Sequence, residues 1–150
     1  SGIDGNVATA AGIARGLGLP ATAVLGDLAV LHDLNSLALL RQTPHPVTLV
    51  VVNNNGGGIF HFLPVAALNT VLEACFATPH GLHFEEAARM FRLDYRRADS
   101  LADFETHYYD RTRGPKPALI EIVTERRPNF ELHQALQSRM VEAAESTLRE

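Results

Sequence analysis

The sequence predicts an α/β fold in which helices cover both faces of a doubly wound, parallel sheet. Three apolar runs have the length of buried strands, and they span residues 21–25, 47–52 and 118–123. Segments with helical spacing of apolar residues lie between these runs, and strands that alternate with helices are typical of parallel sheets. The 150 residues are enough for one domain with a core, so we expect a single domain over residues 1–150.

The N-terminal half begins with a predicted helix at residues 4–17, where small apolar residues recur at helical spacing. Asp4 or Asn6 could cap its first turn by accepting a hydrogen bond from a free backbone N–H group. The strand at residues 21–25 follows. The remaining elements expected in this half are a loop at 27–32, a second helix at 33–42 and the strand at 47–52.

The C-terminal half contains one stretch, residues 59–82, in which prolines and glycines interrupt apolar pairs without a clear period. We expect a long, partly ordered segment near the functional site there, because such segments often serve as lids. Ser100, with Asp103 three residues on, is a predicted helix cap. The other expected elements are short helices at 66–76 and 84–91, a strand at 93–96, a helix at 100–113, the strand at 118–123 and a terminal helix at 129–148.

Charge and composition exclude several classes of function. The formal net charge is −4 and no basic run exceeds a pair of arginines, which argues against a nucleic-acid surface. The single cysteine, Cys75, rules out an internal disulfide and fits a reducing, cytoplasmic setting. The apolar runs are far shorter than the roughly 20 residues of a membrane span. We therefore expect a cytoplasmic protein without a membrane span.

Two polar turns, Gly26–Ala29 and Asn53–Gly58, follow the first two predicted strands. Parallel strands bring such turns to one edge of the sheet, where open α/β sheets bind ligands. Asp27 offers a carboxylate, Asn54 an amide oxygen and Gly56 a backbone carbonyl, and Mg²⁺ prefers oxygen ligands of this kind. The sequence therefore predicts a metal site formed by these three residues, although Asp27 could instead only cap a helix beside an ordinary tight turn.

Because Mg²⁺ shares its coordination shell with ligand phosphates, a diphosphate is the anion that we expect at this edge. Backbone N–H groups of the two turns and of the segment before the first helix could hold it. The only lysine, Lys116, lies in a distant predicted turn, which argues against a P-loop NTPase. The predicted cofactor-binding residues are Gly2, Ile3, Gly26, Asp27, Leu28, Ala29, Asn54, Gly56 and Gly57.

The Gly26-Asp27 pair, followed one helix and one strand later by Asn53-Asn54, resembles the signature of thiamine-diphosphate-dependent enzymes. The common signature has glycine after the aspartate, whereas this chain has Leu28. Within that family, the chain most resembles the SEPHCHC synthases of menaquinone biosynthesis. The resemblance is closest over residues 1–60 and is carried by the runs Ser1–Asn6, Gly26–Asn35 and Asn53–Phe60.

This resemblance implies the thiamine-diphosphate-binding fold, with thiamine diphosphate and Mg²⁺ as cofactors. It implies that Ile3 is the apolar wedge that bends the cofactor, and that Ile59 and Phe60 line the substrate side. The implied reaction decarboxylates 2-oxoglutarate and adds the resulting carbanion to isochorismate. The alternatives are the same domain of another thiamine-diphosphate decarboxylase or carboligase, and a diphosphate-binding module without catalysis.

The resemblance also implies that the chain is the C-terminal fragment of a longer multidomain protein. In such enzymes the glutamate that activates the cofactor belongs to the N-terminal domain of a second subunit. We therefore expect a homodimer or homotetramer for the full-length enzyme, and no turnover by residues 1–150 alone.

Overall fold

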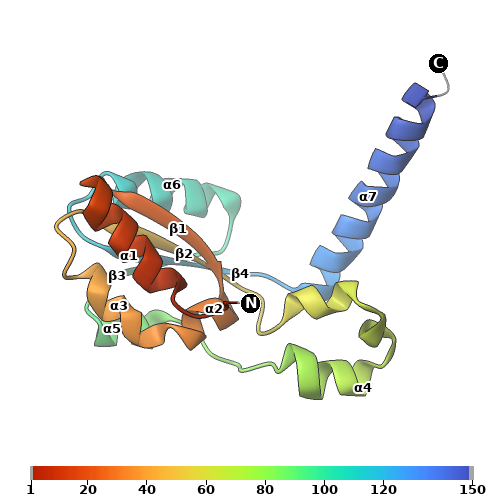
Figure 1. The fold of residues 1–150 in the computed structure, drawn as a ribbon, viewed down its shortest axis with the longest axis horizontal. Helices are drawn as coiled ribbons and strands as arrows, with labels where there is room; N and C mark the ends of the chain where they lie inside the picture. The colour runs from red at the N-terminus through yellow and green to blue at the C-terminus, as the bar shows by residue number, and fades with distance from the viewer. Residues whose placement is uncertain (1, 149–150) are drawn as a thin grey trace.

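The computed structural model describes residues 2–148, and a parallel sheet of four strands forms its centre (Figure 1). The strands lie in the order β1-β2-β4-β3, and Gly26 and Val52 are paired where β1 and β2 end. The predicted parallel α/β sheet is therefore confirmed. The strands are β1 (Ala21–Gly26), β2 (Val47–Asn53), β3 (Asp94–Ala98) and β4 (Ala118–Val123).

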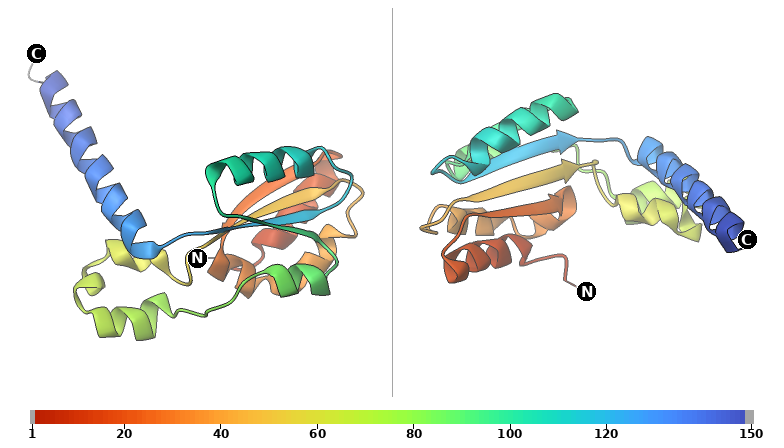
Figure 2. Two further views of the ribbon diagram at one scale, coloured as in Figure 1. Left: turned by 180° about the vertical axis from the view of Figure 1, so that it is seen from behind. Right: turned by 90° about the horizontal axis from the view of Figure 1, so that it is seen from above.

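Helices cover both faces of this sheet, as predicted (Figure 2). Helix α6 (Leu101–Thr112) lies on one face. Ser100 caps it, as predicted, because its hydroxyl oxygen accepts a hydrogen bond from the Asp103 N–H group. The main core lies on the other face, where small side chains of α1 such as Ala14 pack close to β2. The helices on that face are α1 (Asn6–Leu17), α2 (Asp27–His32), α3 (Leu37–Leu40) and α5 (Glu85–Met90).

Between β2 and α5 the chain leaves the sheet and forms a series of short turns, residues 58–77, which we call the lobe (Figure 1). The predicted helix at 66–76 is present only in part, as α4 followed by a π-helical turn. The final helix, α7 (Arg126–Leu148), starts beside the lobe and projects away from the sheet (Figure 2). The elements of the lobe are η2 (Gly58–Phe62), η3 (Pro64–Ala67), α4 (Asn69–Val71) and η4 (Leu72–Ala77).

The predicted loop at 27–32 is wrong, because these residues form α2. The predicted helix at 33–42 is also interrupted: Asp33 has non-helical dihedral angles, and the short turn η1 (Leu34–Ser36) precedes α3. The reason lies in the Asp33 side chain, which is held by α1. Its carboxylate accepts hydrogen bonds from the backbone N–H groups of Val7 and Ala8, at 2.8 and 3.1 Å.

Asp33 thus caps α1 from 26 residues away in the sequence, and the predicted caps Asp4 and Asn6 are wrong. The Asn6 side chain instead donates to the Ile3 carbonyl. Burial by itself raises the pKa of Asp33, but hydrogen bonds from the Ser36 hydroxyl and from the α1 backbone outweigh it and lower the pKa. Helix propensities do not predict this cap, because Asp33 and the first turn of α1 are distant in sequence.

We expect Asp33→Ala to destabilise α1 by about 1–3 kcal/mol, because the buried Val7 N–H and the partly buried Ala8 N–H lose their acceptor. Hydrogen exchange of the α1 amides in the full-length protein measures this directly. Asp4→Ala is the matched control, since the exposed Asp4 side chain does not cap the helix. Equal exchange rates in the Asp33 variant and the wild type would refute the long-range cap.

Candidate functional site

The turns after β1 and β2 meet at the carboxyl edge of the sheet, as the sequence predicts. The backbone N–H of Gly56 donates a hydrogen bond to Asp27 Oδ2 at 2.8 Å, across 29 residues of sequence. The Leu28 N–H donates to the other carboxylate oxygen, Oδ1, also at 2.8 Å. Asp27 is only 2% exposed, so a carboxylate at the first residue of α2 is buried where the two turns join.

Asn54 supplies the clearest sign that this edge takes a ligand. Its Oδ1 atom is buried and has no hydrogen-bond partner among residues 2–148. Leaving a buried acceptor without a partner costs about 1–3 kcal/mol, and a bound cation would satisfy it. The neighbouring Asn53 is fully engaged: its amide nitrogen donates to Leu82 and Glu121, and its oxygen accepts from the Asn55 N–H.

The glycines of the second turn are required by the lobe that packs on them. Gly56 has φ +122°, and a Cβ atom there would lie 2.1 Å from the Ala77 carbonyl oxygen. A Cβ atom on Gly57 would lie 2.7 Å from the Phe60 ring and equally close to the Phe76 carbonyl oxygen. The Gly57 N–H donates to Ala77 at 2.8 Å. The turn can therefore approach the lobe this closely only because positions 56 and 57 carry no side chain.

The ligand set predicted at this edge is one carboxylate, one amide oxygen and one carbonyl. Over the described residues there is no group of three or more His, Cys, Asp or Glu side chains that could hold a metal ion. That finding disfavours a zinc-type site, which takes several nitrogen or sulfur ligands. A buried aspartate in the first turn and an unpaired amide oxygen in the second fit Mg²⁺ that completes its shell with phosphates and water.

The other predicted residues lie around this edge, and their roles stay predictions. Gly2 and Ile3 lie in the exposed segment before α1, with the Ile3 side chain 42% exposed. Ile59 is 72% exposed, as a substrate contact would require. Phe60 is half-buried, because its ring packs edge-on against Phe76 with centroids 5.3 Å apart.

Sequence reasoning missed Glu121, a fully buried carboxylate in β4. Its Oε1 atom lies 2.6 Å from the Asn53 amide nitrogen and 3.1 Å from His83 Nδ1. Its Oε2 atom accepts hydrogen bonds from the Phe84 N–H at 3.0 Å and the Tyr95 hydroxyl at 2.8 Å. A glutamate within an otherwise apolar strand was the available signal.

The same network shifts two pKa values. Burial raises the pKa of Tyr95 strongly, and its hydrogen bond to Glu121 adds to the shift. For Glu121, burial is the largest influence and raises the pKa, but the hydrogen bonds from Asn53, Phe84 and Tyr95 together reverse it and lower the pKa. Glu121 is therefore ionised at neutral pH and ties the end of β2 to β3 and to the start of α5.

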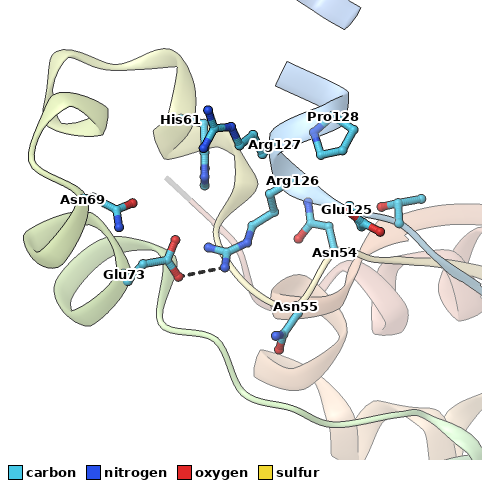
Figure 3. A pocket seen from close by; sticks show the side chains of 10 residues that line it. Asn54, Asn55, His61, Asn69, Glu73, Glu125, Arg126, Arg127 and Pro128 are labelled. Atoms are coloured by element: carbon cyan, nitrogen blue, oxygen red, sulfur yellow. Dashed lines mark hydrogen bonds and ion pairs between the residues drawn. The ribbon is translucent and has the colours of Figure 1, made fainter. Parts of the chain in front are cut away.

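A polar pocket of about 310 Å³ adjoins the Asn54 turn (Figure 3). Arg126, at the start of α7, reaches into it and donates from Nη2 to Glu73 of the lobe at 2.8 Å. Three buried polar atoms of its lining lack a hydrogen-bond partner within the described chain: Asn54 Oδ1, His61 Nδ1 and Arg126 Nη1. The unpaired Arg126 Nη1 can therefore donate to an anionic oxygen of a ligand in this pocket, and Asn54 Oδ1 can accept from a donor or bind a cation.

Comparison with known sequences identifies the family of the chain. A family model described as "Thiamine pyrophosphate enzyme, C-terminal TPP binding domain" matches residues 2–122. The chain is 54% identical over 136 residues to a protein of Rubrobacter xylanophilus and 49% identical over 145 residues to one of Salinibacter ruber. Both are named 2-succinyl-5-enolpyruvyl-6-hydroxy-3-cyclohexene-1-carboxylate synthase. The matches cover 91% and 97% of this chain but 23% and 24% of those proteins, so the chain spans about a quarter of their length.

Solved structures share the fold. Benzoylformate decarboxylase from Polynucleobacter necessarius superposes with a TM-score of 0.67 at 18% identity, over 80% of this chain and 23% of that one. The thiamine diphosphate-dependent 4-hydroxybenzoylformate decarboxylase of Rhodococcus jostii RHA1 gives 0.60 at 23% identity, over 69% and 19% of the two chains. Within the described part of the chain, no helix is both long enough and apolar enough to cross a membrane.

Proposed function

Because the chain belongs to the family of C-terminal, thiamine-pyrophosphate-binding domains of thiamine pyrophosphate enzymes, we propose that it holds the diphosphate of this cofactor through Mg²⁺. The observation that carries the proposal is the junction of the two turns, where the buried Asp27 carboxylate accepts a hydrogen bond from the Gly56 N–H, together with the unpaired Oδ1 atom of Asn54 in the second turn. These two oxygens and the Gly56 carbonyl are the proposed protein ligands of the ion.

The bound cofactor supplies the electron sink for a carbanion, and the residues of this chain bind and orient it. Asp27 contributes the negative charge that attracts the cation, and its burial keeps water from competing for it. Backbone N–H groups of Gly2, Ile3 and Ala29 are proposed to face the diphosphate, with Gly26 and Gly57 allowing its close approach. The Leu28 N–H, which the sequence assigned to the same role, is engaged by Asp27 Oδ1.

For the whole protein we propose the activity of a SEPHCHC synthase, with 2-oxoglutarate and isochorismate as substrates. Relatives that are about half identical over nearly the whole chain, and that carry this name, support the proposal. Since the chain spans about a quarter of those proteins, we further propose that the activating glutamate lies in an N-terminal domain of a second subunit. Because that glutamate would come from a second subunit, the assembly that we propose is a homodimer or homotetramer, located in the cytoplasm.

The test is product formation from 2-oxoglutarate and isochorismate by the full-length protein with thiamine diphosphate and Mg²⁺. Residues 1–150 alone should give no turnover. Product with pyruvate or benzoylformate in place of 2-oxoglutarate, and none with 2-oxoglutarate, would favour another decarboxylase or carboligase. Cofactor binding without turnover of any 2-oxo acid by the full-length protein would favour a non-catalytic module.

We expect Phe60→Ala in the full-length enzyme to lower kcat/KM for isochorismate by an amount worth roughly 1–3 kcal/mol, the cost of losing one apolar contact with the substrate. Phe76→Ala is the matched control, because it removes the other half of the same ring pair. Both variants should melt at a lower temperature, but only the Phe60 variant should lose kcat/KM per folded enzyme. Equal kinetic losses in the two variants would show that Phe60 acts only through packing.

A further inference from the structure

Residues 80–84, which we call the strap, lead the chain from the lobe back toward the sheet. They are hydrogen-bonded to the Asn53–Gly58 turn. Asn55 Oδ1 accepts from the backbone N–H groups of His80 and Gly81, at 3.0 and 2.7 Å. The Leu82 carbonyl accepts from the Asn53 side chain at 2.9 Å. These contacts fix the strap, and hence the His80 side chain, relative to the turn.

His80 lies against Asp27, and the geometry identifies its tautomer. The Leu82 N–H donates to His80 Nδ1 at 3.0 Å, so Nδ1 acts as the acceptor and the ring hydrogen is on Nε2. Nε2 lies 3.0 Å from Asp27 Oδ2 and therefore donates to it. The side chain is only 11% exposed, so this contact is shielded from water.

The two oxygens of the Asp27 carboxylate differ in their hydrogen bonds. Oδ2 receives the Gly56 N–H and His80 Nε2–H, whereas Oδ1 receives the adjacent Leu28 N–H. We propose that His80 is a positioning residue of the magnesium site, which holds Oδ2 so that Oδ1 is presented to the cation. This inference rests on the proposed function, and it assigns a role in the site to a residue 53 positions from Asp27.

The competing explanation is that His80 only shapes the strap through its contact with Leu82. Two substitutions separate the contacts, because a glutamine amide reaches about as far as Nε2 and an asparagine amide about as far as Nδ1. His80→Gln can keep a donor on Asp27 but loses the acceptor for the Leu82 N–H. His80→Asn can keep that acceptor but no longer reaches Asp27.

The experiment titrates Mg²⁺ calorimetrically into the full-length protein with saturating thiamine diphosphate. We expect His80→Asn to weaken Mg²⁺ binding by about 10- to 100-fold, the usual effect of losing a partner of a metal ligand, and His80→Gln to stay close to the wild type. Melting temperatures measured without Mg²⁺ or cofactor report separately how much stability each variant loses through the strap. The order of the variants in melting temperature should differ from their order in Mg²⁺ affinity.

The possible failures can be told apart. If the wild type does not bind Mg²⁺ with thiamine diphosphate, the proposed function itself fails. If the wild type binds and His80→Asn binds equally well, the positioning role of His80 is refuted while the site stands. Equal weakening in the Gln and Asn variants, or a loss in the Gln variant alone, would assign His80 to the fold of the strap.

Discussion

Asp27→Ala in the full-length protein should abolish the coupling by which Mg²⁺ and thiamine diphosphate strengthen each other's binding. The carboxylate is the only charged group of the proposed ligand set, and it is almost fully buried. Losing it should weaken Mg²⁺ binding by more than the roughly 10- to 100-fold that loss of an outer partner costs. Calorimetry with each ligand, in the presence and absence of the other, measures the coupling.

Asp33→Asn is the matched control, since Asp33 is a second buried aspartate of the same region but caps α1. It should lower stability and leave the coupling intact. Asp27→Asn keeps the shape of the side chain and removes its charge, so its Mg²⁺ affinity should fall between the wild type and the alanine variant. Unchanged Mg²⁺ affinity in Asp27→Ala would remove Asp27 from the site and leave it as an ordinary first residue of α2.

The contacts that the sequence could predict are those that follow from local pattern and sheet topology. Buried strands of this length, separated by helices, imply a parallel sheet, and parallel neighbours bring the turns of Asp27 and Gly56 together. The Ser100 cap was predictable for the same reason, because its partner is three residues away. Such inferences need no knowledge of how distant segments pack.

What could not be predicted depends on side chains that meet across long stretches of sequence. The Asp33 cap, the His80 contact with Asp27 and the Glu121 network each join residues 25 or more positions apart. The lobe was equally beyond prediction in detail, since its turns follow contacts with the glycine turn rather than a hydrophobic period. These long-range polar contacts involve α1, the strap and β4.

Glu121→Ala should cost several kcal/mol of folding free energy, because each buried donor left without its acceptor costs about 1–3 kcal/mol and at least two of its donors are buried. Four groups would lose this carboxylate as a hydrogen-bond partner: the Asn53 amide, which keeps its bond to the Leu82 carbonyl, His83, the Phe84 N–H and the Tyr95 hydroxyl. Thermal unfolding of the full-length protein measures the loss. Tyr95→Phe is the control, because it removes one donor and leaves the carboxylate with the other three, so its cost should be about 1 kcal/mol.

The dependence of this effect on pH has a definite sign. The pKa of Glu121 in the folded protein lies below the ordinary value of 4.5, so the carboxylate stabilises the fold above pH 4.5, and this contribution disappears as the pH falls through the folded pKa. Glu121→Gln keeps the size of the side chain but cannot ionise. Whichever carboxylate oxygen its N–H₂ group replaces, that group would face another hydrogen-bond donor, either the Asn53 amide or the Phe84 N–H. That donor would then have no acceptor at residue 121. The difference in stability between the wild type and this variant should therefore be largest near neutral pH and should shrink in acid. A difference that stays constant down to the acid unfolding of the protein would show that packing around residue 121, and not its charge, holds the end of β2 in place.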